Sequence, residues 1–111
     1  MLSEEELIKR VKEWLGTVTP DTPIVMLTYG LERGRDIIRN TNVDYLIKYL
    51  AKKMSMGYTS GEILPTKMEL KGRNFEIILP FWEWKLKNKT FGIVLHNVDK
   101  EKQTWIIKVC Y

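Results

Sequence analysis

The chain has 111 residues, which is the length of one domain and is enough to bury a single hydrophobic core. Apolar residues make up 44% and charged residues 29%, and these proportions exclude an intrinsically disordered chain. The net charge of +4 is compatible with a nucleic-acid partner but does not demand one. The positive charge lies mid-chain, because residues 31–53 and 66–90 each carry six Lys or Arg against three Asp or Glu. We predict one globular domain over residues 1–111.

Several classes of site and location are excluded by what the sequence lacks. Cys110 is the only cysteine and His96 the only histidine, so neither an intrachain disulfide nor a cysteine-based zinc site is expected. No second catalytic group lies near either residue, so we expect His96 to pack or to form a surface hydrogen bond and Cys110 to be a small apolar strand residue. The chain has no apolar run of about 18 residues, and its N-terminus is acidic where a signal peptide would be basic. We therefore predict a cytoplasmic protein with no membrane contact, metal, cofactor or catalytic residues.

The first predicted element is an amphipathic helix in the stretch SEEELIKRVKEWLGTV, Ser3–Val18. Ser3 is placed to cap it, and Glu6 completes a capping box three residues later. Gly16 and the pair Thr19–Pro20 end it. Apolar residues recur at helical spacing, as expected for a face that packs on a core: Leu7, Ile8, Val11, Trp14, Leu15 and Val18.

The next segment predicts a buried strand over Thr22–Gly30, because it is a short apolar run rich in β-branched residues, and the start of a helix is the competing interpretation. The stretch that follows, LERGRDIIRN, is ambiguous. Gly34 weakens a helix, yet Leu31, Ile37 and Ile38 retain some helical spacing, so a helix beginning near Asp36 is one interpretation.

A second helix is predicted from Asn42, its cap, to the glycine at position 57, which suits the left-handed position after a helix end. Its inward stripe comprises Val43, Leu46, Ile47, Leu50 and Met54. Three lysines, Lys48, Lys52 and Lys53, lie in its later half. Together with Arg33, Arg35 and Arg39 they form the candidate anion-binding or nucleic-acid-binding set.

The segment GYTSGEILP, Gly57–Pro65, has two interpretations. As a turn, it folds the hydroxyls of Thr59 and Ser60 onto the backbone, Gly61 supplies an unusual dihedral angle, and Pro65 blocks regular structure. As a site, it is a polar loop carrying Tyr58, Thr59, Ser60 and Glu62. We favour the turn, since these residue types are common in the turns that connect helices and strands.

From Met68 onward the pattern predicts strands, three or four of them in an antiparallel meander. Trp82, Trp84 and Leu86 alternate with Glu83 and Lys85, which places the aromatic rings in the core and the charges in water. The expected fold is α+β, with two helices packed on this sheet.

One resemblance spans about a third of the chain. A helix running into GYTSGE, Asp44 to Glu62, is followed by a W-x-W-x-L strand at Trp82, Trp84 and Leu86. This arrangement is similar to a pattern in small uncharacterised proteins of bacteria, plasmids and phages, although the interval between the two parts is longer here. The resemblance implies an origin on a phage or other mobile element and a class of small interaction protein, but no mechanism.

The cluster TYGLERGRD, Thr28–Asp36, predicts an anion cradle if its glycines form a loop between a strand and a helix. Arginine forks at Arg33 and Arg35 would then bind phosphate oxygens. The segment lacks the glycine spacing and the lysine of a P-loop, and a solvated arginine-rich turn is the alternative that we favour.

Three functions remain open. The first is a small regulatory protein that binds a host macromolecule, most simply another protein. The second is a nucleic-acid-binding module using the basic residues of segment 33–53. The third is a small nucleotide-handling enzyme built on the YGLERGRD loop. Surplus aromatic residues and free strand edges are also compatible with a homodimer.

Overall fold

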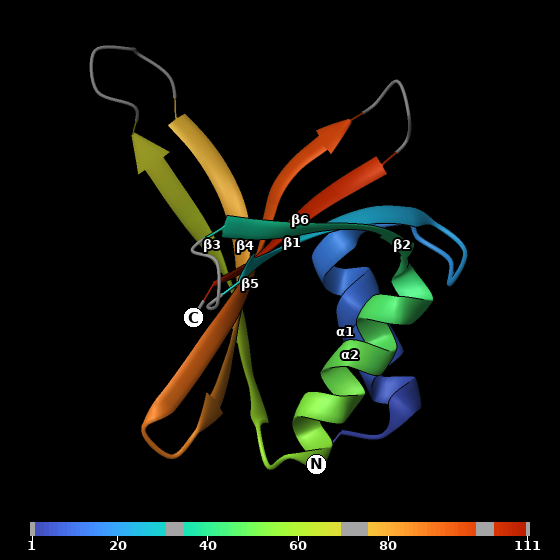
Figure 1. The fold of residues 1–111 in the computed structure, drawn as a ribbon, viewed down its shortest axis with the longest axis vertical. Helices are drawn as coiled ribbons and strands as arrows, with labels where there is room; N and C mark the ends of the chain where they lie inside the picture. The colour runs from blue at the N-terminus through green and yellow to red at the C-terminus, as the bar shows by residue number, and fades with distance from the viewer. Residues whose placement is uncertain (1, 31–34, 70–75, 100–103, 111) are drawn as a thin grey trace.

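The computed structural model describes residues 2–30, 35–69, 76–99 and 104–110 (Figure 1). Two helices and six strands follow one another within these ranges: α1 (Glu4–Leu15), β1 (Pro23–Gly30), β2 (Arg35–Asn42), α2 (Val43–Ser55), β3 (Thr59–Glu69), β4 (Glu76–Leu86), β5 (Lys89–Asp99) and β6 (Thr104–Cys110). The strands form one sheet in the order β2-β1-β6-β5-β4-β3. Its neighbouring strands are antiparallel, except that β1 and β6 run parallel.

The α+β class and the C-terminal meander are confirmed, whereas the predicted size of the sheet is wrong. The sheet has six strands instead of the expected three or four, and it is mixed instead of purely antiparallel. Two of the added strands, β2 and β3, occupy segments that were expected to be ambiguous or a turn, and β1 joins the sheet through a parallel pairing with β6 in which Ile24 lies opposite Trp105. Strands β1 and β6 lie at opposite ends of the sequence, so no local pattern could indicate their pairing.

Helix α1 begins and ends as its sequence predicts. The Ser3 Oγ accepts a hydrogen bond of 3.2 Å from the Glu6 N–H. The helix stops at Leu15, after which Gly16 adopts a positive φ of 93°. The indole N–H of Trp105, in β6, donates to the Leu15 carbonyl at 3.2 Å, which ties the end of the helix to the sheet.

The ambiguous segment before α2 is a strand, and the helix considered near Asp36 is therefore wrong. β2 pairs with β1 residue by residue, from Arg35 opposite Gly30 to Asn42 opposite Pro23. This pairing supplies backbone hydrogen bonds that a short, weak helix could not match. Asn42 then caps α2 as predicted, its side-chain oxygen accepting from the Tyr45 N–H at 3.0 Å.

The interpretation of Gly57–Pro65 as a turn is correct only at its start. Gly57 has the expected positive φ, 104°, but β3 begins at Thr59 and continues through Pro65. Because β3 lies at the edge of the sheet, the missing N–H of Pro65 breaks no ladder on the outer side.

Gly61 is also explained differently from the expectation, since its φ is not positive. It lies in the irregular register between Ser60 and Ile63, where a Cβ would stand 2.8 Å from the Glu83 carbonyl oxygen. A glycine is required here for close approach of two backbones.

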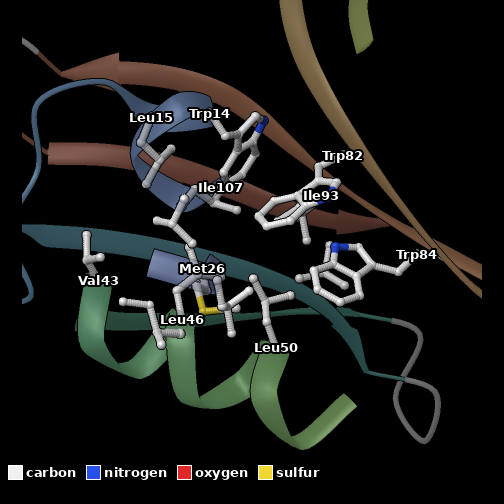
Figure 2. Packing of buried hydrophobic residues seen from close by; sticks show 14 of the residues in the cluster. Trp14, Leu15, Met26, Val43, Leu46, Leu50, Trp82, Trp84, Ile93 and Ile107 are labelled. Atoms are coloured by element: carbon white, nitrogen blue, oxygen red, sulfur yellow. The ribbon is translucent and has the colours of Figure 1, made fainter. Parts of the chain in front are cut away.

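The core lies between the two helices and one face of the sheet (Figure 2). Trp82 and Trp84 are fully buried, as their alternation predicts. Trp84 stacks on Phe91 with ring centroids 6.0 Å apart, while Trp82 meets Trp14 of α1 at 6.3 Å. The core-facing positions of β1, β5 and β6 are filled by Ile24, Met26, Phe91, Ile93, Ile107 and Val109.

Both described helices, α1 and α2, lie together on the core side of the sheet, so within the described ranges no helix covers the opposite face (Figure 1). Strand alternation directs a second apolar set to this open face. Val25, Leu27, Val94 and Ile106 are half-buried there, and Ile38 and Leu64 are exposed. The ring of Phe81 lies directly on Gly92, whose missing side chain makes room for it.

Candidate functional site

The outward side of α2 gathers cations and tyrosines on one surface. Tyr45, Lys48, Tyr49 and Lys52 lie at spacings of three and four residues and therefore share one side of the helix. The opposite stripe is buried: Val43, Leu46, Ile47, Leu50 and Met54. Lys48 and Lys52 are exposed, and Tyr45 is 36% exposed.

Strand β2 adds one more cation to this surface. Arg39 pairs with Met26, whose side chain is in the core, so Arg39 lies on the helix side of the sheet. Its guanidinium carbon is 5.1 Å from the centre of the Tyr45 ring, a cation–π geometry that joins β2 to α2. We call the set Arg39, Tyr45, Lys48, Tyr49, Lys52 and Lys53 the basic–aromatic face.

Lys53 has a different environment from the other lysines. It is half-buried, and its ammonium nitrogen lies 5.4 Å from the ring centre of Tyr49, 5.6 Å from that of Tyr58 and 5.4 Å from that of Phe91. Three aromatic rings around one ammonium stabilise its charge. Lys53 therefore ties the end of α2 to β5 and sits at the rim of the basic–aromatic face.

Lys48 is partly neutralised within its own helix. Its ammonium lies 2.8 Å from the Asp44 carboxylate, and both side chains are well exposed. The hydrogen bond to Asp44 and the charge of that carboxylate raise the pKa of the Lys48 ammonium. The ammonium thus stays charged at neutral pH, while Asp44 reduces the net positive potential of the helix's first turns.

The predicted anion cradle does not have the local structure it needs. The cradle needs a helix to begin near Asp36, but the strand β2 covers Arg35–Asn42, so no helix N-terminus presents backbone N–H groups there. Arg33 and the side chain of Arg35 lie outside the part of the chain that the structure describes. Of the three arginines proposed from the sequence, Arg39 is the one whose side chain is described, and it packs over the Tyr45 ring of α2.

The alternative loop site at residues 58–62 is largely structural. Tyr58 is 9% exposed and meets Phe91 edge-on at 5.0 Å. Thr59 Oγ1 donates to the Lys85 carbonyl at 3.3 Å across the strands. Ser60 Oγ accepts from the buried Trp82 indole N–H at 2.9 Å and donates to the Gly61 carbonyl at 3.2 Å.

What remains of this site is a shallow cleft of about 330 Å³ between the ends of α1, α2 and β3. Its wall consists of Leu2, Arg10, Met54, Gly57, Tyr58, Thr59 and Ser60. Glu62 is exposed but does not line the cleft. The polar segment therefore supports the core through Ser60, and the cation that lines the cleft, Arg10, comes from α1.

No group of three or more His, Cys, Asp or Glu side chains gathers in the described ranges as a metal site would require. His96 belongs to β5, and its side chain is outside the described part of the structure. Cys110 is half-buried in β6. Neither described helix has the length and apolar character needed to cross a lipid bilayer.

Sequence reasoning missed the two tyrosines of the basic–aromatic face. The signal was nevertheless present, because Tyr45 and Tyr49 precede Lys48 and Lys52 by three residues each within a predicted helix.

Comparison of the chain with protein-family models, curated proteins and solved structures finds no match. The site must therefore be interpreted from its own chemistry.

Proposed function

We propose that this protein acts by binding, and that the basic–aromatic face holds a single-stranded nucleic acid. The observation that carries the proposal is the placement of Arg39, Lys48 and Lys52 on the same surface as Tyr45 and Tyr49. Proteins that bind single strands need this combination, since cations follow the phosphates and flat rings stack with bases. This criterion is not met at Trp82 and Trp84, because both rings are buried.

The electrostatics of the surface favour a polyanion over a single small anion. Arg39 and Lys52 belong to different elements, β2 and α2, so the positive charges are spread along the surface and do not converge on one point. The part of the basic–aromatic face that lies on α2, Tyr45 to Lys53, extends over about 12 Å, a length that matches a few nucleotides. Each phosphate contact releases counterions, so affinity is expected to fall steeply with salt.

Fluorescence anisotropy with labelled DNA and RNA single strands of about 20 nucleotides tests this proposal. We expect Lys52→Glu to weaken binding at least about tenfold, because it removes one phosphate contact and adds a repulsive charge. Lys108→Glu is the matched control, since Lys108 is exposed on the open face of the sheet. Equal weakening by both variants would reduce the effect to net charge and would reject a site on α2.

The stacking half of the proposal has its own variant. Tyr45→Ala removes a ring that is partly exposed, and we expect weaker binding with a nearly unchanged salt dependence. Tyr45→Phe should bind like the wild type, because it keeps the ring and loses only the hydroxyl. Affinity that is unaffected by Tyr45→Ala would mean that the tyrosine does not stack on a base.

A protein partner is the second candidate, and the open face of the sheet favours it. Neither described helix covers its apolar residues, of which Ile38 and Leu64 are exposed, and exposed apolar patches mark protein-binding surfaces. This candidate retains the hypothesis of a regulatory protein from a phage or other mobile element. Affinity capture from a bacterial lysate, with and without nuclease, separates the two candidates. Capture of host protein that survives nuclease and is lost in Leu64→Lys would favour the protein partner.

A further inference from the structure

Strand β2 is an edge of the sheet, and its centre is unusually apolar. One side of β2 pairs with β1, and its other side forms the end of the sheet. Ile37 and Ile38 occupy the middle of the strand and are 51% and 67% exposed. They point to opposite faces because successive strand residues alternate. An exposed edge with apolar side chains on both faces is a template for pairing with another strand.

The other edge of the sheet, β3, is protected in the ways that edge strands usually are. It contains Pro65, which removes one N–H, and an irregularity between Ser60 and Ile63 that disturbs a flat ladder. Strand β2 has no proline, no lysine and a continuous register with β1 over all eight of its residues. The contrast singles out β2 as the edge that is open to pairing.

We infer that two copies of this chain pair through β2, in antiparallel orientation about a two-fold axis at Ile38. A two-fold axis perpendicular to the sheet must lie midway between the two copies of one residue, which then stand opposite each other. An axis between two successive residues would pair side chains from opposite faces, whereas paired residues share a face. At Ile38 the axis places the two Ile38 residues together, Ile37 opposite Arg39, and Asp36 opposite Asn40. No like charges stand directly opposite each other in this register.

The neighbouring registers are less favourable because they place like charges opposite each other. An axis at Ile37 places Arg35 opposite Arg39 of the other copy, and axes at Asp36 or Arg39 place each of these residues opposite itself. Like charges directly opposite each other destabilise a strand pair. An axis at Asn40 also avoids like charges, but it pairs only residues 38–42 and leaves Ile37 outside the pairing, whereas the axis at Ile38 pairs residues 35–41. Charge and paired length together therefore place the centre at Ile38, and a second copy of the same chain fits this edge.

This pairing has a consequence for the surface of α2. The axis is perpendicular to the sheet, so the helices of both copies lie on the same side of one continuous sheet. Arg39 lies on that side, one residue from the axis, and its guanidinium packs over Tyr45 of its own chain. The two basic–aromatic faces thus become neighbours. The dimer itself does not depend on the proposed nucleic-acid binding.

Sedimentation velocity over protein concentrations from about 1 to 100 µM tests the pairing. A single strand-to-strand interface is smaller than a standard protein interface, so we expect a dimer dissociation constant in about the micromolar range. Ile38→Lys places two ammonium groups at the axis and should weaken the dimer more than about tenfold. Leu64→Lys is the matched control, because Leu64 is 44% exposed on the other edge strand, and it should leave the dimer intact.

A chain that stays monomeric at the highest concentration would overturn the inference. So would a dimer that resists Ile38→Lys, or one that both lysine variants weaken equally. Circular dichroism checks that each variant folds, which we expect because both positions are exposed.

Cysteine cross-linking tests the register without disturbing the charge. In a Cys110→Ser background, Ile38→Cys should form an intermolecular disulfide on mild oxidation, because the two residues face each other. Asn40→Cys should not, since its two copies would lie four residues apart along the strand, about 13 Å, beyond the reach of a disulfide. Efficient cross-linking of Asn40→Cys, or none of Ile38→Cys, would contradict the register.

Discussion

Two buried tryptophans differ in their hydrogen bonding, and we therefore expect the same substitution to lower the free energy of unfolding by different amounts. Trp82 and Trp84 are both fully buried and their ring centroids are 4.9 Å apart. The Trp82 indole N–H donates to Ser60 Oγ at 2.9 Å and to the Gly61 carbonyl at 3.3 Å. The Trp84 indole nitrogen is buried and has no hydrogen-bond partner in the described part of the structure.

Replacing each tryptophan by phenylalanine removes the same atoms from equally buried positions, so the loss of packing is similar in both variants. Trp82→Phe also loses a hydrogen bond with a net value of about 1 kcal/mol and leaves Ser60 short of a donor. Trp84→Phe instead removes an unsatisfied donor, whose burial costs about 1–3 kcal/mol. We therefore expect Trp82→Phe to lower the free energy of unfolding by about 2 kcal/mol more than Trp84→Phe does.

Urea denaturation followed by circular dichroism measures the two free energies of unfolding. In a thermal melt the same difference corresponds to roughly 8 °C in Tm for a chain of this length. The variant Ser60→Ala removes the acceptor of this hydrogen bond. Ser60→Ala should lower the free energy of unfolding much less in the Trp82→Phe background than in the wild type, because the hydrogen bond is already absent there. Equal losses of unfolding free energy for the two variants, Trp82→Phe and Trp84→Phe, or a larger loss for Trp84→Phe, would mean that the Trp82 hydrogen bond and the unpaired Trp84 nitrogen do not set the difference.

Three further predictions concern single contacts. Gly61→Ala should destabilise the protein by about 1–3 kcal/mol in the same denaturation assay, since its Cβ would stand 2.8 Å from the Glu83 carbonyl oxygen; a neutral result would mean that β3 shifts freely. Asn42→Ala should cost about 1 kcal/mol because it removes the cap of α2, and Asn42→Asp should retain most of that stability. Asp44→Asn should lower the pKa of the Lys48 ammonium toward its ordinary value in an NMR titration, and an unchanged pKa would show that the ion pair does not persist in solution.

The helices and the buried tryptophans were predictable because their signals are local. Ser3 and Asn42 cap α1 and α2 as their positions predict, and apolar spacing gave the buried side of each helix. Trp82 and Trp84 alternate with charged residues, which placed both rings in the core. Each of these features depends on residues within a few positions of one another.

The edge strands could not be predicted because their stability comes from distant partners. Gly61 and Pro65 are typical of turns, yet β3 tolerates them because it pairs on one side only, with β4. Ile37 and Ile38 fit a helix or a strand equally well, and pairing with β1 decides between the two. The parallel contact of β1 with β6 joins the two ends of the chain, which no local pattern indicates.

The candidate site was half predictable. The lysines of α2 were identified from the helical pattern, and the structure leaves Lys48 and Lys52 exposed. The contribution of Arg39 depends on the side of β2 that faces α2, and this side is set by the register with β1. The close approach of Lys53 to Phe91 likewise depends on β5 packing against the end of α2.

The decisive measurement for nucleic-acid binding through α2 is the salt dependence of affinity for a single strand. With Arg39, Lys48 and Lys52 each contacting one phosphate, the logarithm of the association constant should fall against the logarithm of salt concentration with a slope of about −2. Lys52→Gln should make this slope shallower by about 0.7, and Lys108→Gln should leave it unchanged. A flat salt response, or equal slopes for Lys52→Gln and Lys108→Gln, would contradict phosphate binding on this helix.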